Sequence, residues 1–435
     1  MKTNFTPVRH ITFWTASSFV VASMIGTGVF TSLGYQLVDI QSIFPLLMLW
    51  VVGGIVALCG SLSYSELGSA LPRSGGEYHL LSHILHPSIG FSAGIVSATV
   101  GFTAPSVLAA MALGSYLKAV FPFFDKTIVA FIVILFFHVI HMKSIRWGTF
   151  FQDSSTAIKV GLILIFIFCG FLTDHTQSIS IMPKPGDGSI LLSSSFAVSL
   201  VWVSYAYTGW NSVIYIAGEI KEPQINIPKT MLFSTGFVMC LYMLLNYIFL
   251  YTASINDMIG NVDVGYISGV AIFGEIGAKV VGLGISILLL STISSYVYIG
   301  PRIMQIMGED HSLLSFLKIR GDDNIPRIAF FVQFFISILF LFTSSFEQVL
   351  MYAGITLIII TILTIASLFV LRYSSPKLER PYKVWGYPIT PLLYLIVNIW
   401  ILYFSFKEAP FESLVGIGII IISMLIYYIF IKKNS

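Results

Sequence analysis

Ser23-Met24-Ile25-Gly26-Thr27-Gly28 interrupts the first long apolar run of this chain, and Ala206-Tyr207-Thr208-Gly209-Trp210-Asn211 interrupts the sixth. Glycine and small polar residues in an apolar span weaken its backbone pairing, so the freed amide and carbonyl groups must face a wet or ligand-filled cavity. Paired interruptions in two halves of a chain indicate a binding site between inverted repeats. Close helix packing through small residues is the alternative interpretation. We favour the binding site because the two interruptions are in register.

The composition is that of a membrane protein. Of the 435 residues, 56% are hydrophobic and only 10% are charged, and the mean hydropathy is +0.89. Soluble domains carry about 25% charged residues. This density excludes soluble enzymes, disulfide scaffolds, disordered chains and nucleic-acid-binding proteins. The run from Ile11 is too long for a signal peptide, so we expect it to be retained as a span.

The apolar runs predict twelve membrane-spanning helices. They cover residues 11–36, 43–70, 88–120, 127–143, 153–172, 190–217, 229–253, 267–305, 327–345, 347–372, 388–406 and 411–431. The run at 267–305 is too long for one perpendicular span, so it either tilts or begins with a short helix outside the membrane. Cys59, Cys169 and Cys240 all lie inside apolar runs, so we expect no disulfide and no metal cluster.

The basic residues predict the orientation. When both termini are placed inside, most of the 23 lysines and arginines fall in inner loops. Those assigned to the outer side are Lys118, Lys126, Lys184, Lys279 and Lys407. This bias favours an even number of spans with both ends cytoplasmic. We therefore expect a multi-pass protein of the plasma membrane, which is the inner membrane if the cell is bacterial.

Three motifs in order resemble one known family. The first span contains Ala22-Ser23-Met24-Ile25-Gly26-Thr27-Gly28-Val29-Phe30, and the second ends in Tyr64-Ser65-Glu66-Leu67-Gly68 before Pro72-Arg73-Ser74-Gly75-Gly76-Glu77-Tyr78. The sixth contains Tyr205-Ala206-Tyr207-Thr208-Gly209-Trp210-Asn211. These stretches resemble the amino acid–polyamine–organocation (APC) transporters, most closely the L-type amino acid transporter and bacterial exchanger branch.

The resemblance implies an all-α membrane protein with the leucine-transporter fold. Its twelve helices would form a 5+5 inverted repeat with broken first and sixth helices. Residues 1–173 would be the first repeat and residues 190–372 the second. Residues 388–435 would add the last two helices and a short cytoplasmic tail.

The breaks offer a complement to each end of a free amino acid. The half-helix that begins near Thr27 and Gly28 presents free amides and a positive dipole end, which suits a carboxylate. Carbonyls near Met24, Tyr205 and Thr208 suit an ammonium. The predicted substrate-binding residues are Ser23, Met24, Ile25, Gly26, Thr27, Gly28, Tyr205, Ala206, Thr208, Gly209 and Asn211. The resemblance makes Tyr205 an aromatic lid and Asn211 a polar pocket residue.

The break residues are uncharged, so we favour neutral L-amino acids as the substrate. No phosphate-binding loop and no catalytic Ser/His/Asp pattern is found in the sequence, so we expect no cofactor, no nucleotide hydrolysis and no enzyme activity. A secondary transporter that works by alternating access is the preferred interpretation. An ion or solute channel and an intramembrane enzyme are the alternatives from other classes, and a channel would require a filter motif.

The energy source depends on the fifth and eighth spans. Sodium-coupled members of this fold bind a cation with carbonyls of the first helix and a Ser/Thr pair, for which Ser294 and Ser295 are candidates. In the family that this chain resembles, the fifth helix carries a lysine whose ammonium takes the place of that sodium. Lys159 matches this position. A lysine that extends to the headgroups is the alternative. We expect sodium-independent exchange or proton symport, with a sodium-coupled amino acid or amine symporter as the alternative.

Two other polar features have simpler interpretations. Glu66 near the inner end of the second span is either a proton relay or an anchor, and we favour the anchor. His79, His83 and His86 are spaced for one face of a loop helix, and we favour an interfacial helix over a metal site.

The resemblance also bears on partners. Animal L-type exchangers are linked to a heavy subunit by a disulfide from the loop between the third and fourth helices. Here that loop, Phe121 to Lys126, has no cysteine. We expect a monomer or weak homo-oligomer in membrane lipid, without a disulfide-linked subunit and without nucleic acid.

Overall fold

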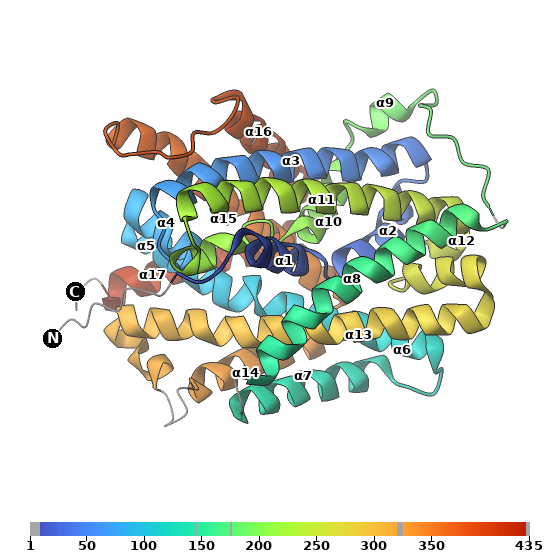
Figure 1. Cartoon of the computed structure of the whole chain (residues 1–435), viewed down its shortest axis with the longest axis horizontal. Helices are drawn as coiled ribbons and strands as arrows, with labels where there is room; N and C mark the ends of the chain where they lie inside the picture. The colour runs from blue at the N-terminus through green and yellow to red at the C-terminus, as the bar shows by residue number, and fades with distance from the viewer. Residues whose placement is uncertain (1–8, 144–145, 175, 320–324, 432–435) are drawn as a thin grey trace.

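The computed structural model describes residues 9–143, 146–174, 176–319 and 325–431, without the side chains of 146–155. These residues form a bundle of helices, most of which run along its long axis (Figure 1), and an isolated bridge between Ile11 and Ile220. The first half comprises α1 (Phe13–Met24), α2 (Gly28–Asp39), α3 (Ile43–Ala70), α4 (Gly76–Ile84), α5 (Pro87–Val96), η1 (Ser97–Gly101), α6 (Thr103–Val120), α7 (Lys126–Lys143) and α8 (Arg146–Leu172).

The second half begins with a short helix and a broken span. It comprises α9 (Asp187–Ile190), α10 (Ser194–Tyr207), η2 (Ser212–Glu219), α11 (Pro223–Thr252), α12 (Ile255–Met258), α13 (Val264–Asp310), η3 (Ser312–Lys318), α14 (Arg327–Thr343), α15 (Phe346–Ser374), α16 (Ile389–Glu408), α17 (Pro410–Ile426) and η4 (Tyr427–Ile431). The extreme ends, residues 1–8 and 432–435, which we predict to be cytoplasmic, lie outside the described residues.

Helices occupy all twelve predicted runs. In the described part of the chain, nine helices are long and apolar enough to cross a membrane. Two shorter apolar helices, Thr156–Leu172 and Arg327–Thr343, and the 14-residue α10 account for the remaining runs. The protein is therefore a helical, polytopic membrane protein, and the count of twelve crossings stays a prediction.

Both predicted interruptions are present. The first span stops at Met24 and resumes as α2 at Gly28, because Ile25 leaves the helical region with ψ 89°. The sixth span stops at Tyr207 and continues only as the 3₁₀ turn η2. Gly209 between them has φ +109°, and a Cβ there would lie 2.7 Å from the carbonyl oxygen of Ser23. Glycine is required here because the two breaks pack directly against each other.

The long run at 267–305 is bent, and a short helix precedes the long one. Gly274 has φ 69° and ψ 178°, which divides α13 into a short first segment and a long second one. A residue with a side chain would be strained in that conformation, so the glycine permits the bend.

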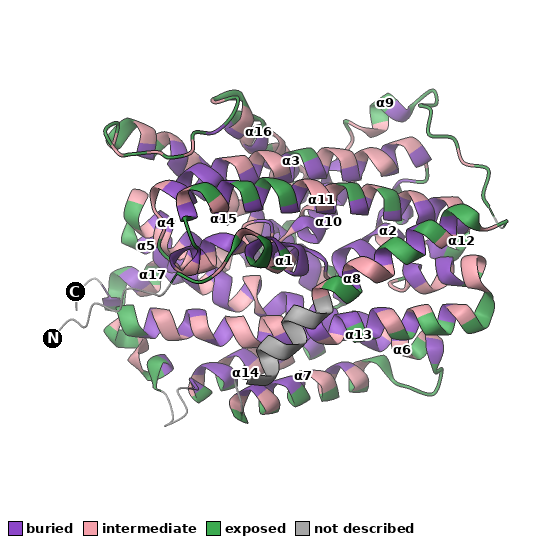
Figure 2. Ribbon diagram, in the orientation of Figure 1, coloured by how far each residue is buried: buried purple, intermediate pink, exposed green. Residues whose placement is uncertain are grey.

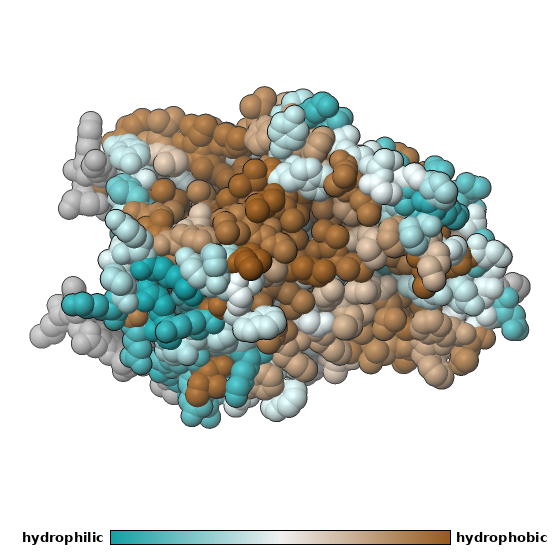
Figure 3. Space-filling model, turned by 90° about the horizontal axis from the view of Figure 1, so that it is seen from above, coloured by the Kyte–Doolittle hydropathy of each residue, from teal (hydrophilic) through white to brown (hydrophobic). Residues whose placement is uncertain are grey.

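The surface and the core are both apolar, as a lipid environment requires. Figure 2 shows buried residues concentrated around α1 and α10, with exposed residues on the outer helices. The largest fully buried side chains include Trp50, Tyr64, Tyr116, Tyr207 and Tyr242. Figure 3 shows hydrophobic residues across the middle of one face and hydrophilic residues gathered toward its ends. This distribution is that of a bundle whose middle faces hydrocarbon.

Glu66 is an anchor, as we favoured. Its carboxylate accepts hydrogen bonds from Arg372 at 2.8 and 2.6 Å and from the backbone N–H of Val384 at 2.7 Å. The Arg380 guanidinium lies 3.5 Å away. The carboxylate therefore ties the C-terminal end of α3 to the end of α15 and the segment that follows it.

The prediction of one histidine-bearing helix face is wrong for its last member. His79 and His83 lie on α4, which ends at Ile84. His86 is in extended backbone, and its Nδ1 accepts a hydrogen bond from the Ser88 N–H to cap α5. The helix stops early because Pro87 disfavours a helical conformation for the preceding residue.

Candidate functional site

The two breaks enclose a small cavity of about 10 Å³, room for about one water molecule. Its lining comes from both broken spans and from α13: Met24, Gly26, Thr27, Gly28, Tyr205, Ala206, Thr208, Thr292 and Tyr296. The Tyr205 hydroxyl lies 3.4 Å from that of Thr27 and so joins α10 to the start of α2. This conformation is too tight at the breaks themselves for an amino acid.

A much larger cavity of about 430 Å³ adjoins the breaks and shares Thr208, Thr292 and Tyr296 with the small one. From the predicted set it is lined by Ser23, Thr208, Gly209, Asn211 and Ser295. Loop residues Ser74, Gly75 and Glu77, together with Glu219 and Arg302, line it as well. This volume is large enough for a small-molecule substrate.

The first and last described residues of the chain lie at one end of the bundle. The large cavity extends toward this same end. The backbone N–H of His10 donates to the backbone carbonyl of Glu219, a residue on the cavity wall. Tyr427 packs on His86 and on His311, which lies just beyond α13. The cavity therefore extends from the breaks toward the end of the bundle that we predict to be cytoplasmic.

The carbonyls freed at the first break already accept hydrogen bonds. The Tyr242 hydroxyl donates to the Met24 carbonyl at 2.6 Å, and the Tyr296 hydroxyl donates to that of Ser23 at 3.4 Å. A carbonyl oxygen has two lone pairs, so each can accept a second donor. Neither tyrosine was in the predicted site, because a tyrosine in an apolar run has no pattern that separates it from core packing.

Lys159 is the cation at this break. Its side chain is 2% exposed, and its ammonium donates to the carbonyl of Ile25 at 3.1 Å and to the Thr292 hydroxyl at 2.9 Å. A longer contact of 3.5 Å reaches the carbonyl of Ala22. The lysine therefore joins α8 to both α1 and α13 and does not extend to the surface. Ile25, predicted to touch substrate, instead presents its carbonyl to this lysine.

Ser294 and Ser295, the candidates for a cation-binding pair, have other partners than Lys159, and their part in coupling stays a prediction. Ser294 pairs with the His141 ring at 2.9 Å, and Ser295 donates to the Ser291 carbonyl one turn earlier in its own helix at 3.0 Å. Thr292 takes the position beside the ammonium. A shift of two residues rotates a helical side chain by more than half a turn, so sequence spacing alone does not identify the right hydroxyl.

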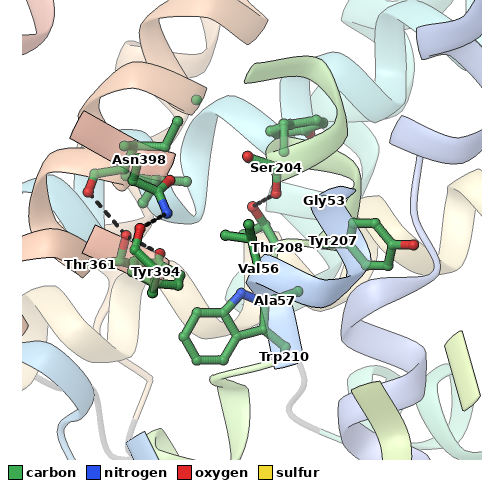
Figure 4. Close-up of a pocket in the computed structure, with 14 residues that line it drawn as sticks. Gly53, Val56, Ala57, Ser204, Tyr207, Thr208, Trp210, Thr361, Tyr394 and Asn398 are labelled. Carbon is green, nitrogen blue, oxygen red and sulfur yellow. Dashed lines mark hydrogen bonds between the residues drawn. The ribbon is translucent and has the colours of Figure 1, made fainter. Parts of the chain in front are cut away.

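A side pocket of about 40 Å³ continues from the large cavity between α3, α10, α15 and α16 (Figure 4). The two share Thr208, Trp210, Leu357 and Thr361. The Tyr394 hydroxyl donates to Thr361 at 2.7 Å, and Thr208 donates to the Ser204 carbonyl at 3.2 Å. The pocket has room for a few water molecules, so the open space extends past the sixth break.

The glycines of the first break have different surroundings. A Cβ at Gly28 would lie 2.4 Å from the Cα of Ala206, so α2 and α10 touch there and any side chain would push them apart. The sequence suggests that Gly28→Leu would block substrate and leave the fold intact; the structure contradicts the second half of that expectation. A Cβ at Gly26 would lie 3.7 Å from Thr292, an ordinary contact.

Gly26→Ala is therefore the informative substitution at this break. We expect the protein to fold and the KM for amino acid uptake to rise about ten-fold, because one added methyl group takes space at the narrowest part of the cavity. The measurement is a substrate titration of uptake into proteoliposomes. Gly236→Ala on α11, where a Cβ has no neighbour within 4 Å, is the matched control. An unchanged KM in Gly26→Ala would mean that substrate does not approach this break.

A polytopic helical protein with a cavity between two interrupted spans belongs, as a class, to the membrane transport proteins. A family model described as amino acid permease matches residues 11–431, and the chain belongs to that family. The match spans nearly the whole chain. The function of this protein is therefore amino acid transport, and the protein is neither a channel nor an enzyme.

Known relatives agree with this assignment. The large neutral amino acids transporter small subunit 2 of Mus musculus is 25% identical over 439 residues, which covers 97% of this chain and 81% of the relative. The b(0,+)-type amino acid transporter 1 of Homo sapiens is 24% identical, with 95% and 86% covered. The cystine/glutamate transporter of Homo sapiens is 24% identical, with 97% and 85% covered. The resemblance to the L-type branch is thereby confirmed.

Proposed function

We propose that this permease moves neutral L-amino acids by alternating access, without sodium, at a site formed by its two broken helices. The single observation that supports it most is the position of Lys159 between the first break and α13. Its ammonium is bonded to carbonyl and hydroxyl oxygens, the ligands that a hard cation such as sodium takes in proteins. A fixed positive charge there leaves no place for a sodium ion.

The substrate would enter from the large cavity and approach the breaks. Its carboxylate would face the amides at the start of α2, near Thr27 and Gly28, with the positive end of the helix dipole behind them. Its ammonium would face the Ser23 and Met24 carbonyls, each of which has one further lone pair. Tyr205 and Asn211, one on either side of the sixth break, would cover the ligand.

The proposal also covers the overall architecture and its orientation in the membrane. Under the proposal, twelve helices form a leucine-transporter fold in which residues 1–173 and 190–372 are inverted repeats and residues 388–435 an addition. Under the same proposal, the two broken spans, α1–α2 and α10–η2, are the first helices of the two repeats. The protein would lie in the plasma membrane with both termini in the cytoplasm. Neutral substrates are favoured because the break residues carry no charge and because one relative is named for large neutral amino acids.

The proposal is tested by amino acid uptake into proteoliposomes with sodium replaced by choline at fixed pH. We expect the same saturable, stereoselective uptake in both salts, because no sodium ion takes part in the cycle. A collapse of uptake in choline would favour the alternative, a sodium-coupled symporter. Exchange and proton symport are then separated by varying the pH gradient with and without internal amino acid: exchange requires the internal substrate, whereas symport follows the gradient.

We also propose that the chain works without a disulfide-linked subunit. One relative is named a small subunit. In this chain α6 ends at Val120 and α7 begins at Lys126, and no cysteine lies between them. Purification from native membranes followed by non-reducing electrophoresis should give the chain at its own mass. A stoichiometric partner that disappears on reduction would contradict this expectation.

A further inference from the structure

A buried carboxylate on the wall of the large cavity has no role in the transport cycle proposed above. Glu77 lies in the first turn of α4, is 3% exposed, and borders the large cavity. Its two oxygens accept hydrogen bonds from the Asn211 amide and the Tyr215 hydroxyl, and a longer one of 3.3 Å from Tyr64. Asn211 directly precedes η2 and Tyr215 lies within it, so one carboxylate holds the start of the segment that follows the break.

The loop before Glu77 holds the same segment at its other end. The Ser74 hydroxyl accepts a hydrogen bond of 3.1 Å from the Gly218 N–H near the end of η2. Gly76 has φ +58°, and a Cβ there would lie 2.3 Å from the Tyr215 ring. The loop is therefore in direct contact with η2, and only glycine fits at this position.

The groups that donate hydrogen bonds to the Glu77 carboxylate are uncharged. Among the described residues, the three side chains that donate to it are an amide and two phenols. Burial raises the pKa of the Glu77 carboxyl, and these hydrogen bonds oppose the rise. Within the part of the chain that the structure describes, the other titratable groups that face it or share its cavity are Tyr64, Tyr215, Tyr296, Tyr298, Tyr394, Glu219 and Arg302. A carboxylate held in this way loses an acceptor when it takes up a proton.

We propose that Glu77 is the positioning residue of the sixth break: through Asn211 and Tyr215 it clamps η2 against the Ser74–Glu77 loop and thereby sets the wall of the substrate cavity. This inference rests on the proposed transport site, because it assigns a role to the cavity wall beside that site. Under this proposal Glu77 acts through Asn211 and Tyr215.

The first test compares uptake by Glu77→Gln and by the wild-type protein. A glutamine keeps the size of the side chain but replaces one acceptor oxygen by a donor, so Tyr215 must turn toward Ser97, which lies 3.2 Å from its hydroxyl. We expect uptake to fall about ten-fold, the effect of losing one charge-assisted hydrogen bond. Tyr215→Phe removes only the hydrogen bond from Tyr215 to Glu77 and should also lower uptake. This variant tests the proposal if Glu77→Gln does not fold. The double variant should lose little more than Glu77→Gln alone, because both changes break the same contact.

Tyr78→Phe, at the next residue of α4, is the matched control. Its hydroxyl donates to Asp310 at 2.7 Å, away from η2. We expect uptake by this variant to stay within two-fold of wild type. Equal losses in Tyr78→Phe and Glu77→Gln would mean that the loop matters only for general stability, and would overturn the proposal.

The second test measures the clamp without transport. Ser212 begins η2 and borders the cavity. A Ser212→Cys variant is treated with a water-soluble thiol reagent, and the modification of the peptide that carries position 212 is followed by mass spectrometry. We expect a several-fold faster modification when Glu77→Gln is added and no change when Tyr78→Phe is added. Equal modification rates in all three would overturn the proposal, even if the wild-type protein transports amino acids.

The third test is the pH profile, measured with equal pH on both sides of the membrane. Since the ionised form of Glu77 makes the clamp, uptake should be full above the raised pKa of this carboxyl and should fall as the pH drops through it. Glu77→Gln should lack this acidic limb, whereas Tyr78→Phe should keep it. An identical acidic limb in Glu77→Gln would contradict the role of Glu77. Absence of uptake in the wild-type protein would refute the proposed function instead.

Discussion

Lys159→Ala is expected to reduce amino acid uptake about 100-fold. The substitution removes an ammonium that donates to the Ile25 carbonyl at 3.1 Å and to the Thr292 hydroxyl at 2.9 Å. Losing two charge-assisted hydrogen bonds at about 1.5 kcal/mol each corresponds to roughly this factor. The three helices that meet at the first break would lose their shared contact. The measurement is the initial rate of uptake of labelled amino acid into proteoliposomes.

Lys118→Ala is the control, because the same change is made at an exposed lysine of α6. We expect it to transport at the wild-type rate. Lys159→Arg should not restore uptake, since the planar guanidinium does not fit the oxygens that surround a compact ammonium. Near-normal uptake by Lys159→Ala would show that the charge at the first break is dispensable, and the account of sodium independence would fail with it.

Glu66→Gln is expected to lower the free energy of unfolding by about 3 kcal/mol, because it leaves a buried cluster of basic groups without its counter-charge. The carboxylate accepts two hydrogen bonds from Arg372, one of them at 2.6 Å, and lies 3.5 Å from Arg380. Arg380 is the more buried of the two, with 9% of its side chain exposed. The measurement is thermal unfolding of the purified protein in detergent.

The control for this effect is Glu379→Gln, at an exposed carboxylate of the segment that follows α15. We expect an unchanged melting temperature for this variant. Equal stability of Glu66→Gln and the wild type would mean that the ion pair contributes no net free energy. Loss of uptake by Glu66→Gln with full stability would point to the proton relay that we did not favour.

The positions of the helices and of both breaks could be predicted from sequence because both depend on local chemistry. An apolar run of about 20 residues must pair its own backbone in lipid, so it forms a helix wherever it occurs. The glycines at 26, 28 and 209 mark places where that pairing fails. The candidate Lys159 came from the resemblance to the family pattern, in which the fifth helix carries this lysine.

Several contacts of the site could not be predicted, because they join residues far apart in the chain. The partner of Lys159 on α13 is 133 residues away, and the sequence offers several hydroxyls near that place. The choice of Thr292 over Ser294 depends on the rotation of α13 about its axis, which packing determines. The two residues that Glu77 holds at the sixth break are 134 and 138 positions away.

Sequence alone determined that this chain lies in a membrane, where its helices run and where two of them break. These properties depend on the transfer of each segment from water to hydrocarbon, a free energy that is nearly additive along the chain. The tertiary structure decided which oxygens bind Lys159, that Glu66 is an anchor, that Gly28 is a packing contact with Ala206, and that Glu77 reaches the sixth break. Such contacts depend on the relative rotation and separation of helices, which arise from close packing of many side chains at once and leave no period in the sequence.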